Sequence, residues 1–195
     1  MAEVFDELEF SSSLSMSRGH FIYESGHHGD LWLELDGLFR QPSKTNGWVK
    51  QLCVLLAQLE FEYVCGPLLG GGFIGYAMAA ALGKQFIYSE RKVNADGMAV
   101  YGIPEPEQRL LAEKKVLVVD DAINAGSAIR ATHRELVHCG AEVVGFASFL
   151  TLGGARERIA NEFGAPCMSL KDIDRQMWPA KSCPLCAAAV PIQNI

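Results

Sequence analysis

Two adjacent carboxylates, Asp120 and Asp121, directly follow an apolar run at residues 116–119. Four consecutive apolar residues are typical of a strand that is buried on both faces of a parallel sheet. Residues 124–128, with the sequence Asn-Ala-Gly-Ser-Ala, then predict a tight turn that opens a helix. Carboxylates accept O–H hydrogen bonds strongly, so acids beside such a turn suit a ligand that carries hydroxyl groups next to a phosphate.

The turn itself has the character of a phosphate site. The start of a helix leaves several backbone N–H groups unpaired and carries partial positive charge, which favours a phosphate dianion. Asn124 and Ser127 are good helix caps, and we expect the helix to stop at Gly140. The loop lacks the Lys-Ser/Thr ending of a P-loop and the Gly-x-Gly-x-x-Gly of a dinucleotide site. The alternative is a surface turn with two solvated acids, because acids at strand ends also occur in unrelated α/β folds.

Residues 116–130 resemble the phosphoribosyl diphosphate (PRPP) signature of type I phosphoribosyltransferases, in which an apolar strand, two acids and a loop of small residues follow in this order. The resemblance implies that Asp120 and Asp121 hold the ribose hydroxyls and belong to the catalytic residues. It also implies that the loop binds the 5′-phosphate through Asn124, Ala125, Gly126, Ser127 and Ala128.

A second glycine-rich loop, residues 66–72, lies between a predicted strand at 63–65 and a predicted helix from Phe73 to about Leu82. By itself this pattern is weak evidence, since glycine also serves tight turns and close packing. In the resembled family the loop wraps the pyrophosphate of PRPP. The resemblance therefore implies backbone N–H donors, in a strained backbone, at Leu68, Leu69, Gly70 and Gly71.

Two cations, Arg91 and Lys92, follow the next predicted strand, residues 85–88. They lie where the family's Arg-Lys pair contacts pyrophosphate, in part across a dimer interface, and Lys92 is counted among the catalytic residues. The alternative is that these are surface charges that only aid solubility. Residues 93–114 are rich in glycine, proline and charge, which predicts a mobile hairpin or lid.

The lid departs from the pattern of orotate phosphoribosyltransferases. Those enzymes bring a Lys and a His over the substrate, whereas this chain has Ala95 and Gly97 at the corresponding positions. The resemblance therefore leaves Asp96, Tyr101 or a water molecule to replace the usual acid.

The N-terminal region contains two strand-like runs, residues 21–26 and 31–35, separated by a turn rich in glycine and histidine. Its Ser25-Gly26, the aromatic strand that follows and Pro42 resemble the opening of orotate phosphoribosyltransferases, where this region forms part of a hood over the base. His27 and His28 either face the ligand or are solvated turn residues. A helix at residues 46–60, capped by Asn46, is expected to pack on the sheet.

Strands and helices alternate through most of the chain, which implies right-handed crossovers and ligand sites at the carboxyl ends of parallel strands. We therefore expect an α/β protein with the type I phosphoribosyltransferase fold: a mostly parallel central sheet flanked by helices, with a small hood from the N- and C-terminal segments. The whole chain, residues 1–195, is expected to form one domain. Its core covers about residues 46–169, and its hood comprises residues 1–45 and 170–195.

The base pocket is the least typical part of the resemblance. Orotate enzymes often carry an Asp-Arg pair after the strand that ends here near Leu150, but this chain has Thr151 and Leu152. A buried carboxylate without a cation is costly, so the orotate carboxylate would need Arg156, His27, His28 or backbone amides. The weakly assigned pocket residues are His28, Thr151 and Arg156, and we expect PRPP binding with low orotate turnover.

The C-terminal segment contains the sequence Cys183-Pro-Leu-Cys186, which resembles the ending of some bacterial and archaeal orotate phosphoribosyltransferases. Two cysteines cannot complete a tetrahedral zinc site unless other ligands are found, and no second Cys pair or His-x₃₋₅-His run is present. A redox pair is the alternative, but it does not precede a helix in a thioredoxin-like unit. We therefore expect no zinc at Cys183 and Cys186, and no metal held by protein ligands alone. The pair is instead interpreted as a structural clasp of the hood.

Composition sets limits on location and partners. The net charge is −6, the isoelectric point is near 5.4, and no run of Lys or Arg suggests nucleic-acid binding. No segment approaches a membrane span, and the acidic start is unlike a signal peptide, so we expect a cytoplasmic protein with reduced thiols.

The resemblance implies a homodimer that uses Mg²⁺ and PRPP to transfer ribose 5-phosphate to a nitrogenous base, orotate in the resembled enzymes, with release of pyrophosphate. The alternatives are a diverged enzyme that uses another base and a non-catalytic PRPP or nucleotide sensor.

Overall fold

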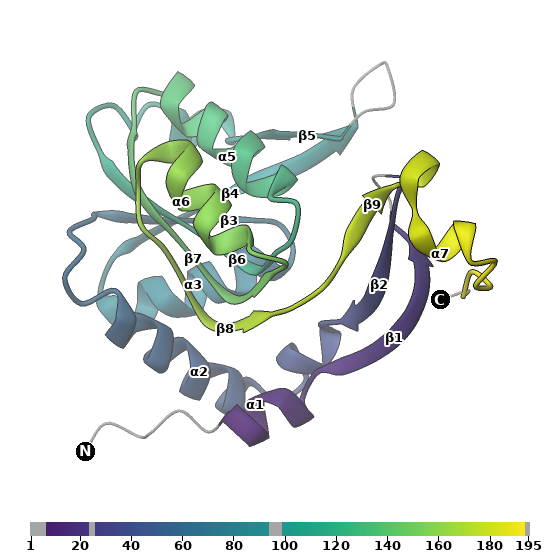
Figure 1. Cartoon of the computed structure of the whole chain (residues 1–195). Coiled ribbons are helices and arrows are strands. Elements are labelled where there is room, and N and C mark those ends of the chain that lie inside the picture. The colour runs from purple at the N-terminus through teal and green to yellow at the C-terminus, as the bar shows by residue number, and fades with distance from the viewer. Residues whose placement is uncertain (1–6, 24–25, 94–98, 194–195) are drawn as a thin grey trace.

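A six-stranded sheet forms the centre of the protein in the computed structural model, which describes residues 7–23, 26–93 and 99–193. The strands are β3 (Tyr63–Pro67), β4 (Gln85–Val93), β5 (Ala99–Gly102), β6 (Lys115–Ile123), β7 (Glu142–Leu152) and β8 (Cys167–Ile173). Their order in the sheet is β5-β4-β3-β6-β7-β8, and every neighbouring pair is parallel except β4 and β5. This confirms the predicted α/β class with a mostly parallel sheet (Figure 1).

Helices cover both faces of this sheet (Figure 1). They are α1 (Glu7–Ser12), α2 (Pro42–Leu55), α3 (Gly70–Leu82), α5 (Ser127–His138) and α6 (Ala155–Phe163). Because successive side chains of a strand point to opposite faces, β6 contributes to two cores. Leu117 and Val119 pack with α1, α2 and α3, whereas Val116 and Val118 pack with α5 and α6. All four side chains are buried, as the apolar run predicts.

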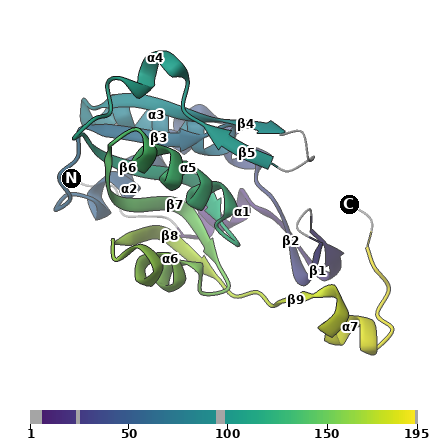
Figure 2. The ribbon, with the colours of Figure 1, turned by 90° about the horizontal axis from the view of Figure 1, so that it is seen from above.

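A second, three-stranded antiparallel sheet stands beside the core and is called the hood below (Figures 1 and 2). Its strands come from both ends of the chain: β1 (Ser15–Ile22), β2 (His27–Glu34) and β9 (Met177–Pro179). The C-terminal segment, residues 180–193, packs beyond β9. The remaining short elements are η1 (Asp36–Phe39), α4 (Glu105–Gln108), η2 (Ala180–Ser182) and α7 (Pro184–Ala187). Among the described residues, no helix is long and apolar enough to cross a membrane.

Local signals placed some boundaries correctly and others not. Helix α5 ends before Gly140, with φ of 81°, which confirms the predicted stop, and α6 ends in the same way at Gly164, with φ of 62°. The predicted helix at 46–60 begins at Pro42 instead, because a proline suits the first turn of a helix, where its missing N–H costs nothing. Asn46 therefore lies inside the helix and is no cap.

The histidines of the N-terminal region differ from their expected placement. His27 and His28 were expected in a turn between two strands, but both belong to β2 and pair with β9. Pairing with a strand near the other end of the chain is invisible to local periodicity.

Candidate functional site

The acid pair Asp120 and Asp121 lies within the last residues of β6 and not after it, because pairing with β7 continues to Ile123. Both residues are only partly exposed. The Asp121 N–H donates to Oδ1 of Asp120 at 3.0 Å, and the Ala122 N–H donates to Oδ1 of Asp121 at 2.7 Å. These bonds fix the orientation of the two carboxylates at the carboxyl edge of the sheet.

The environment makes it costly for these acids to be charged. Burial raises the pKa of Asp120 well above the ordinary value, and the neighbouring Asp121 carboxylate raises it further. Burial likewise raises the pKa of Asp121, although the hydrogen bond from the Ala122 N–H opposes this shift. A ligand that brings O–H donors or positive charge to this pair would relieve part of that cost.

The glycine-rich loop lies directly against the acids. A Cβ atom on Gly70 would overlap with Oδ2 of Asp121. A Cβ atom on Gly71 would lie 2.6 Å from the Val119 carbonyl oxygen and 2.9 Å from Oδ1 of Asp120. Only glycine fits at either position, so the glycine-rich loop and the acid pair share one site.

Helix α3 begins at Gly70, earlier than the predicted Phe73, so Gly70, Gly71 and Gly72 form its first turn. The N–H groups of a first turn have no intrahelical acceptor and can bind an anion. Leu68 was expected to be a donor as well, but its N–H bonds to the Ser89 carbonyl at 3.0 Å, so that part of the prediction is wrong. The peptide bond between Leu68 and Leu69 is cis.

The predicted 5′-phosphate loop leads into α5 through Gly126, which is the N-cap residue with φ of 82°. No side chain caps this helix, so the expected capping by Asn124 and Ser127 is wrong. The first-turn N–H groups at Ser127 and Ala128 are thereby left for a ligand. Among the described residues, the buried Oδ1 of Asn124 has no hydrogen-bond partner.

Two arginines hold this loop, and neither was among the predicted site residues. Arg130 donates to the Ala125 carbonyl and forms a two-pronged ion pair with Glu162 at 2.7–2.9 Å. Arg158 donates to the Gly153 carbonyl and, at 3.4 Å, to the Asn124 carbonyl. Their spacing in the sequence carries no signal, since Arg130 joins the loop to α6 and Arg158 joins it to the loop after β7.

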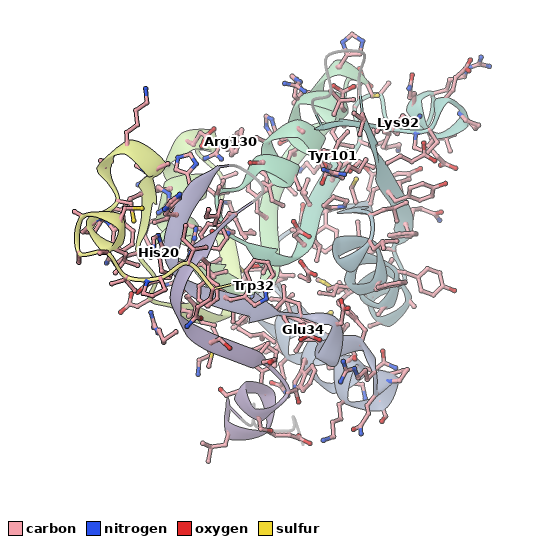
Figure 3. All side chains as sticks on the ribbon, turned by 90° about the vertical axis from the view of Figure 1, so that its right-hand side faces the viewer. His20, Trp32, Glu34, Lys92, Tyr101 and Arg130 are labelled. Carbon is pink, nitrogen blue, oxygen red and sulfur yellow. The ribbon has the colours of Figure 1, made fainter. Side chains whose placement is uncertain are left out.

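Arg91 and Lys92 lie on β4, which continues beyond the predicted end at Tyr88 and pairs with β5. Lys92 and Tyr101 are labelled on this hairpin in Figure 3. The Lys92 ammonium lies 2.9 Å from the Glu90 carboxylate, with 63% of the Lys92 side chain exposed. The lid predictions for Ala95, Asp96 and Gly97 lie outside the described residues.

The weakly assigned base-pocket residues are engaged elsewhere. Thr151 is buried and donates to Asp172, and Arg156 forms an ion pair with the same carboxylate at 2.7 Å. The Nδ1 atom of His28 lies 2.9 Å from the His20 ring and 3.2 Å from the sulfur of Cys186. Thr151 and His28 are therefore occupied by partners within the protein, whereas 42% of the Arg156 side chain remains exposed.

A different cation, Arg175, lies between the hood and the loop that follows β7. Its side chain is only 6% exposed, and its guanidinium carbon lies 4.9 Å from the centre of the Tyr23 ring. The Arg175 side chain also packs on Gly153, whose Cβ would lie 3.5 Å from its Cγ. Nη2 donates to the Met177 sulfur at 3.3 Å, but Nε and Nη1 have no partner among the described residues.

An unpartnered buried guanidinium is costly, so it marks a place for an anion. Arg175 lies two residues after the carboxyl end of β8, the edge where ligands bind in open α/β sheets. That position was the signal in the sequence, but residues 170–195 were treated there only as part of the hood.

A model of the phosphoribosyl transferase domain matches residues 45–180, which include both ligand loops and the acid pair. The chain belongs to the phosphoribosyltransferase family. An orotate phosphoribosyltransferase from a Nitratiruptor species is 30% identical over 189 residues, which cover 91% of each chain. A second one, from Thermotoga maritima, is 27% identical over 92% of this chain and 91% of its own. This phosphoribosyltransferase thus matches curated relatives over nearly their full length.

Solved structures agree on the fold of this phosphoribosyltransferase. An orotate phosphoribosyltransferase from Aeropyrum pernix matches with a TM-score of 0.67 and 22% identity, over 85% of this chain and 90% of that one. An adenine phosphoribosyltransferase from Thermoanaerobacter pseudethanolicus matches with a TM-score of 0.69 and 18% identity, over 87% and 99%. Because enzymes named for different bases share the fold, the fold alone does not identify the base.

Proposed function

We propose that this phosphoribosyltransferase transfers the ribose 5-phosphate group of PRPP to orotate and releases pyrophosphate. The observation that carries the proposal is the contact between the first turn of α3 and the acid pair, where Gly70 lies directly against the Asp121 carboxylate. It brings two helix N-termini and two carboxylates to one edge of the sheet, as a ribose with phosphate groups on both sides requires.

The parts of PRPP are assigned by chemistry. The 5′-phosphate suits the uncapped start of α5 and residues 124–128. Arg130 supports this loop through its hydrogen bond to the Ala125 carbonyl. The ribose hydroxyls suit Asp120 and Asp121 as acceptors. The pyrophosphate suits the first turn of α3, with Arg91 and Lys92 as the cations of the neighbouring strand.

The reaction breaks the bond between C1 of the ribose and the pyrophosphate oxygen and forms a bond from C1 to a ring nitrogen of the base. Positive charge grows on the ribose as the bond loosens, so the enzyme gains most by stabilising the charge of the departing pyrophosphate. Mg²⁺ bound to the diphosphate would supply charge neutralisation, and the carboxylate oxygens of Asp120 and Asp121 are of the type that this hard cation prefers. Asp120 and Asp121 would orient the ribose, and Lys92 would hold the leaving group.

Arg175 supports orotate as the base. Orotate carries a carboxylate, and the buried guanidinium of Arg175, whose Nε and Nη1 have no partner among the described residues, supplies a positive charge to pair with it. The Tyr23 and Trp32 rings, stacked with centroids 6.3 Å apart, add a flat aromatic surface on the hood side. The sequence-based expectation of low orotate turnover rested on the lack of a cation, and Arg175 removes that reason. We now expect a turnover number within the ordinary range of roughly 1–10³ s⁻¹.

The proposal includes a homodimer. Three apolar side chains at the start of α3 are strongly exposed: Leu69 at 71%, Phe73 at 56% and Tyr76 at 67%. An apolar patch of this kind, next to the pyrophosphate loop, is typical of a protein–protein interface. Sedimentation of the purified protein checks the oligomeric state, and a monomer at enzyme concentrations used in assays would contradict this part of the proposal.

The central test is product formation from PRPP, Mg²⁺ and a panel of bases that contains orotate, uracil and adenine. We expect orotidine 5′-monophosphate and pyrophosphate in equal amounts, with orotate as the preferred base. Turnover with adenine alone would favour a diverged enzyme with another base. PRPP binding in calorimetry without any product would favour a sensor, and either result would overturn the assignment to orotate.

A further inference from the structure

Four potential metal ligands converge where the hood meets the C-terminal segment. His20 comes from β1, His28 from β2, and Cys183 and Cys186 from either side of the turn into α7. One nitrogen or sulfur atom of each side chain lies within 4.8 Å of those of the other three. Figure 3 shows His20 at this junction. The Cys-x-x-Cys that lacked partners in the sequence therefore has two histidines as neighbours.

The distances fit a tetrahedral site. With Zn–N bonds of about 2.0 Å and Zn–S bonds of about 2.3 Å, tetrahedral edges are about 3.3 Å between nitrogens and about 3.5 Å between nitrogen and sulfur. Nε2 of His20 lies 3.6 Å from the Cys183 sulfur and 3.7 Å from the Cys186 sulfur. The two histidine nitrogens are 2.9 Å apart, and Nδ1 of His28 is 3.2 Å from the Cys186 sulfur. These four edges depart from the tetrahedral values by about 0.1–0.4 Å, and the other two edges are no longer than 4.8 Å.

The surroundings orient the ligands. Nδ1 of His20 lies 2.8 Å from the Val190 carbonyl oxygen, so the ring N–H points there and the lone pair of Nε2 points into the cluster. A backbone carbonyl in this role is the usual support of a metal-bound histidine. His20, His28 and Cys183 are buried, with 1%, 7% and 4% exposure, whereas Cys186 is exposed and offers a path of entry.

We propose that this phosphoribosyltransferase binds one Zn²⁺ through His20, His28, Cys183 and Cys186. Two thiolates with two imidazoles form a set that selects zinc over hard cations such as Mg²⁺. All four positions of the tetrahedron are filled by the protein, so the ion is structural and holds no substrate. The expectation of no zinc at the two cysteines rested on the spacing of possible ligands along the chain, which does not reveal two histidines brought in by β1 and β2.

The role of the ion follows from the elements that it joins. Residues 20 and 28 belong to the β1–β2 pair, and the cysteines lie more than 150 residues later. The only strand pairing between these regions in the described residues is the three-residue contact of β9 with β2. Zinc would fasten the C-terminal segment to the hood, since metal binding to a folded site contributes directly to folding free energy.

Metal content of the protein tests the proposal. Protein purified under reducing conditions without chelator should contain about one zinc per chain by elemental mass spectrometry. Cys183→Ser and His20→Asn should lose it, whereas the matched controls Cys139→Ser and His138→Gln should keep it. Wild-type protein that is folded and reduced, yet takes up no zinc when the ion is added, would overturn the proposal.

Cobalt provides a readout that does not depend on whether a variant folds. Co²⁺ added to chelator-stripped wild-type protein should produce the intense visible bands of tetrahedral coordination and a thiolate charge-transfer band, and zinc should abolish both. The exposed Cys186 allows the mild variant Cys186→Ser, which should weaken the charge-transfer band in a folded protein. A disulfide between Cys183 and Cys186 in freshly isolated protein, with no cobalt spectrum after reduction, would contradict the inference.

Discussion

Gly70 and Asp121 touch across the site, so closely that a Cβ atom on the glycine would overlap with the carboxylate oxygen. The helix that is proposed to receive pyrophosphate therefore cannot be separated from the acids that are proposed to receive ribose. A ligand that binds one of them meets the other.

This contact predicts the effect of Gly70→Ala. The added methyl group must displace the Asp121 carboxylate or shift the first turn of α3, so we expect PRPP affinity to fall at least tenfold, about 1.4 kcal/mol. Calorimetry with Mg²⁺ and PRPP measures it. The control is Gly47→Ala in α2, where a Cβ meets nothing within 4 Å and alanine should stabilise the helix by roughly 0.5–1 kcal/mol. Unchanged PRPP affinity in Gly70→Ala would show that PRPP binding does not depend on this contact.

The second prediction concerns Asp120 and Asp121 as acceptors of the ribose hydroxyls. Each charge-assisted hydrogen bond contributes roughly 1.5–3 kcal/mol, so Asn at both positions should weaken PRPP binding at least tenfold. Inorganic phosphate, which lacks the ribose hydroxyls, should bind the double variant as well as it binds wild type. If PRPP affinity is retained in the double variant, the ribose lies elsewhere.

The same acids predict an unusual dependence of stability on pH. Burial raises the pKa of both in the folded state, so between about pH 3.9, the unfolded value, and the raised pKa the folded protein holds more protons than the unfolded one. The contribution of the pair to stability therefore falls as pH rises through that window. We expect Asp120→Asn to be more stable than wild type at neutral pH and to lose this advantage below about pH 4.

Thermal unfolding across pH measures this difference, and Glu62 provides a control of opposite sign. The hydrogen bond from Lys114 lowers the pKa of Glu62, so Glu62→Gln should cost a little stability at neutral pH and nothing in acid. An Asp120→Asn variant that is less stable than wild type at neutral pH would show that the carboxylate is needed by the fold.

The fourth prediction concerns Arg175 and the identity of the base. Replacing it with Gln removes the charge that is proposed to bind the orotate carboxylate, so the KM for orotate should rise at least tenfold, while the KM for PRPP should stay within about twofold. The KM for uracil, which lacks the carboxylate, should differ less between wild type and variant than the KM for orotate does. The control is Arg109→Gln, because 84% of the Arg109 side chain is exposed and its guanidinium lies 3.9 Å from the Glu105 carboxylate. Equal loss of PRPP and orotate binding in Arg175→Gln would indicate a structural role.

The chain's own sequence determined the central part of the site. The apolar run before Asp120, the small residues of the loop at 124–128 and the glycines after β3 are local patterns, and local patterns decide where strands, turns and helix starts form. Because parallel strands end at one edge, these patterns were sufficient to expect the acids and both loops together. The helix stop at Gly140 followed from the same kind of reasoning.

Tertiary structure alone decided which of the remaining polar residues share a site. Thr151 and Arg156 were expected at the base, but Asp172 on the neighbouring strand holds both. Arg175 packs beside Gly153 because the chain passes from β8 to the hood there. His20 meets Cys186 because β9 returns to pair with β2. Contacts between segments far apart in the chain depend on how whole elements pack, and the period of a sequence carries no record of that packing.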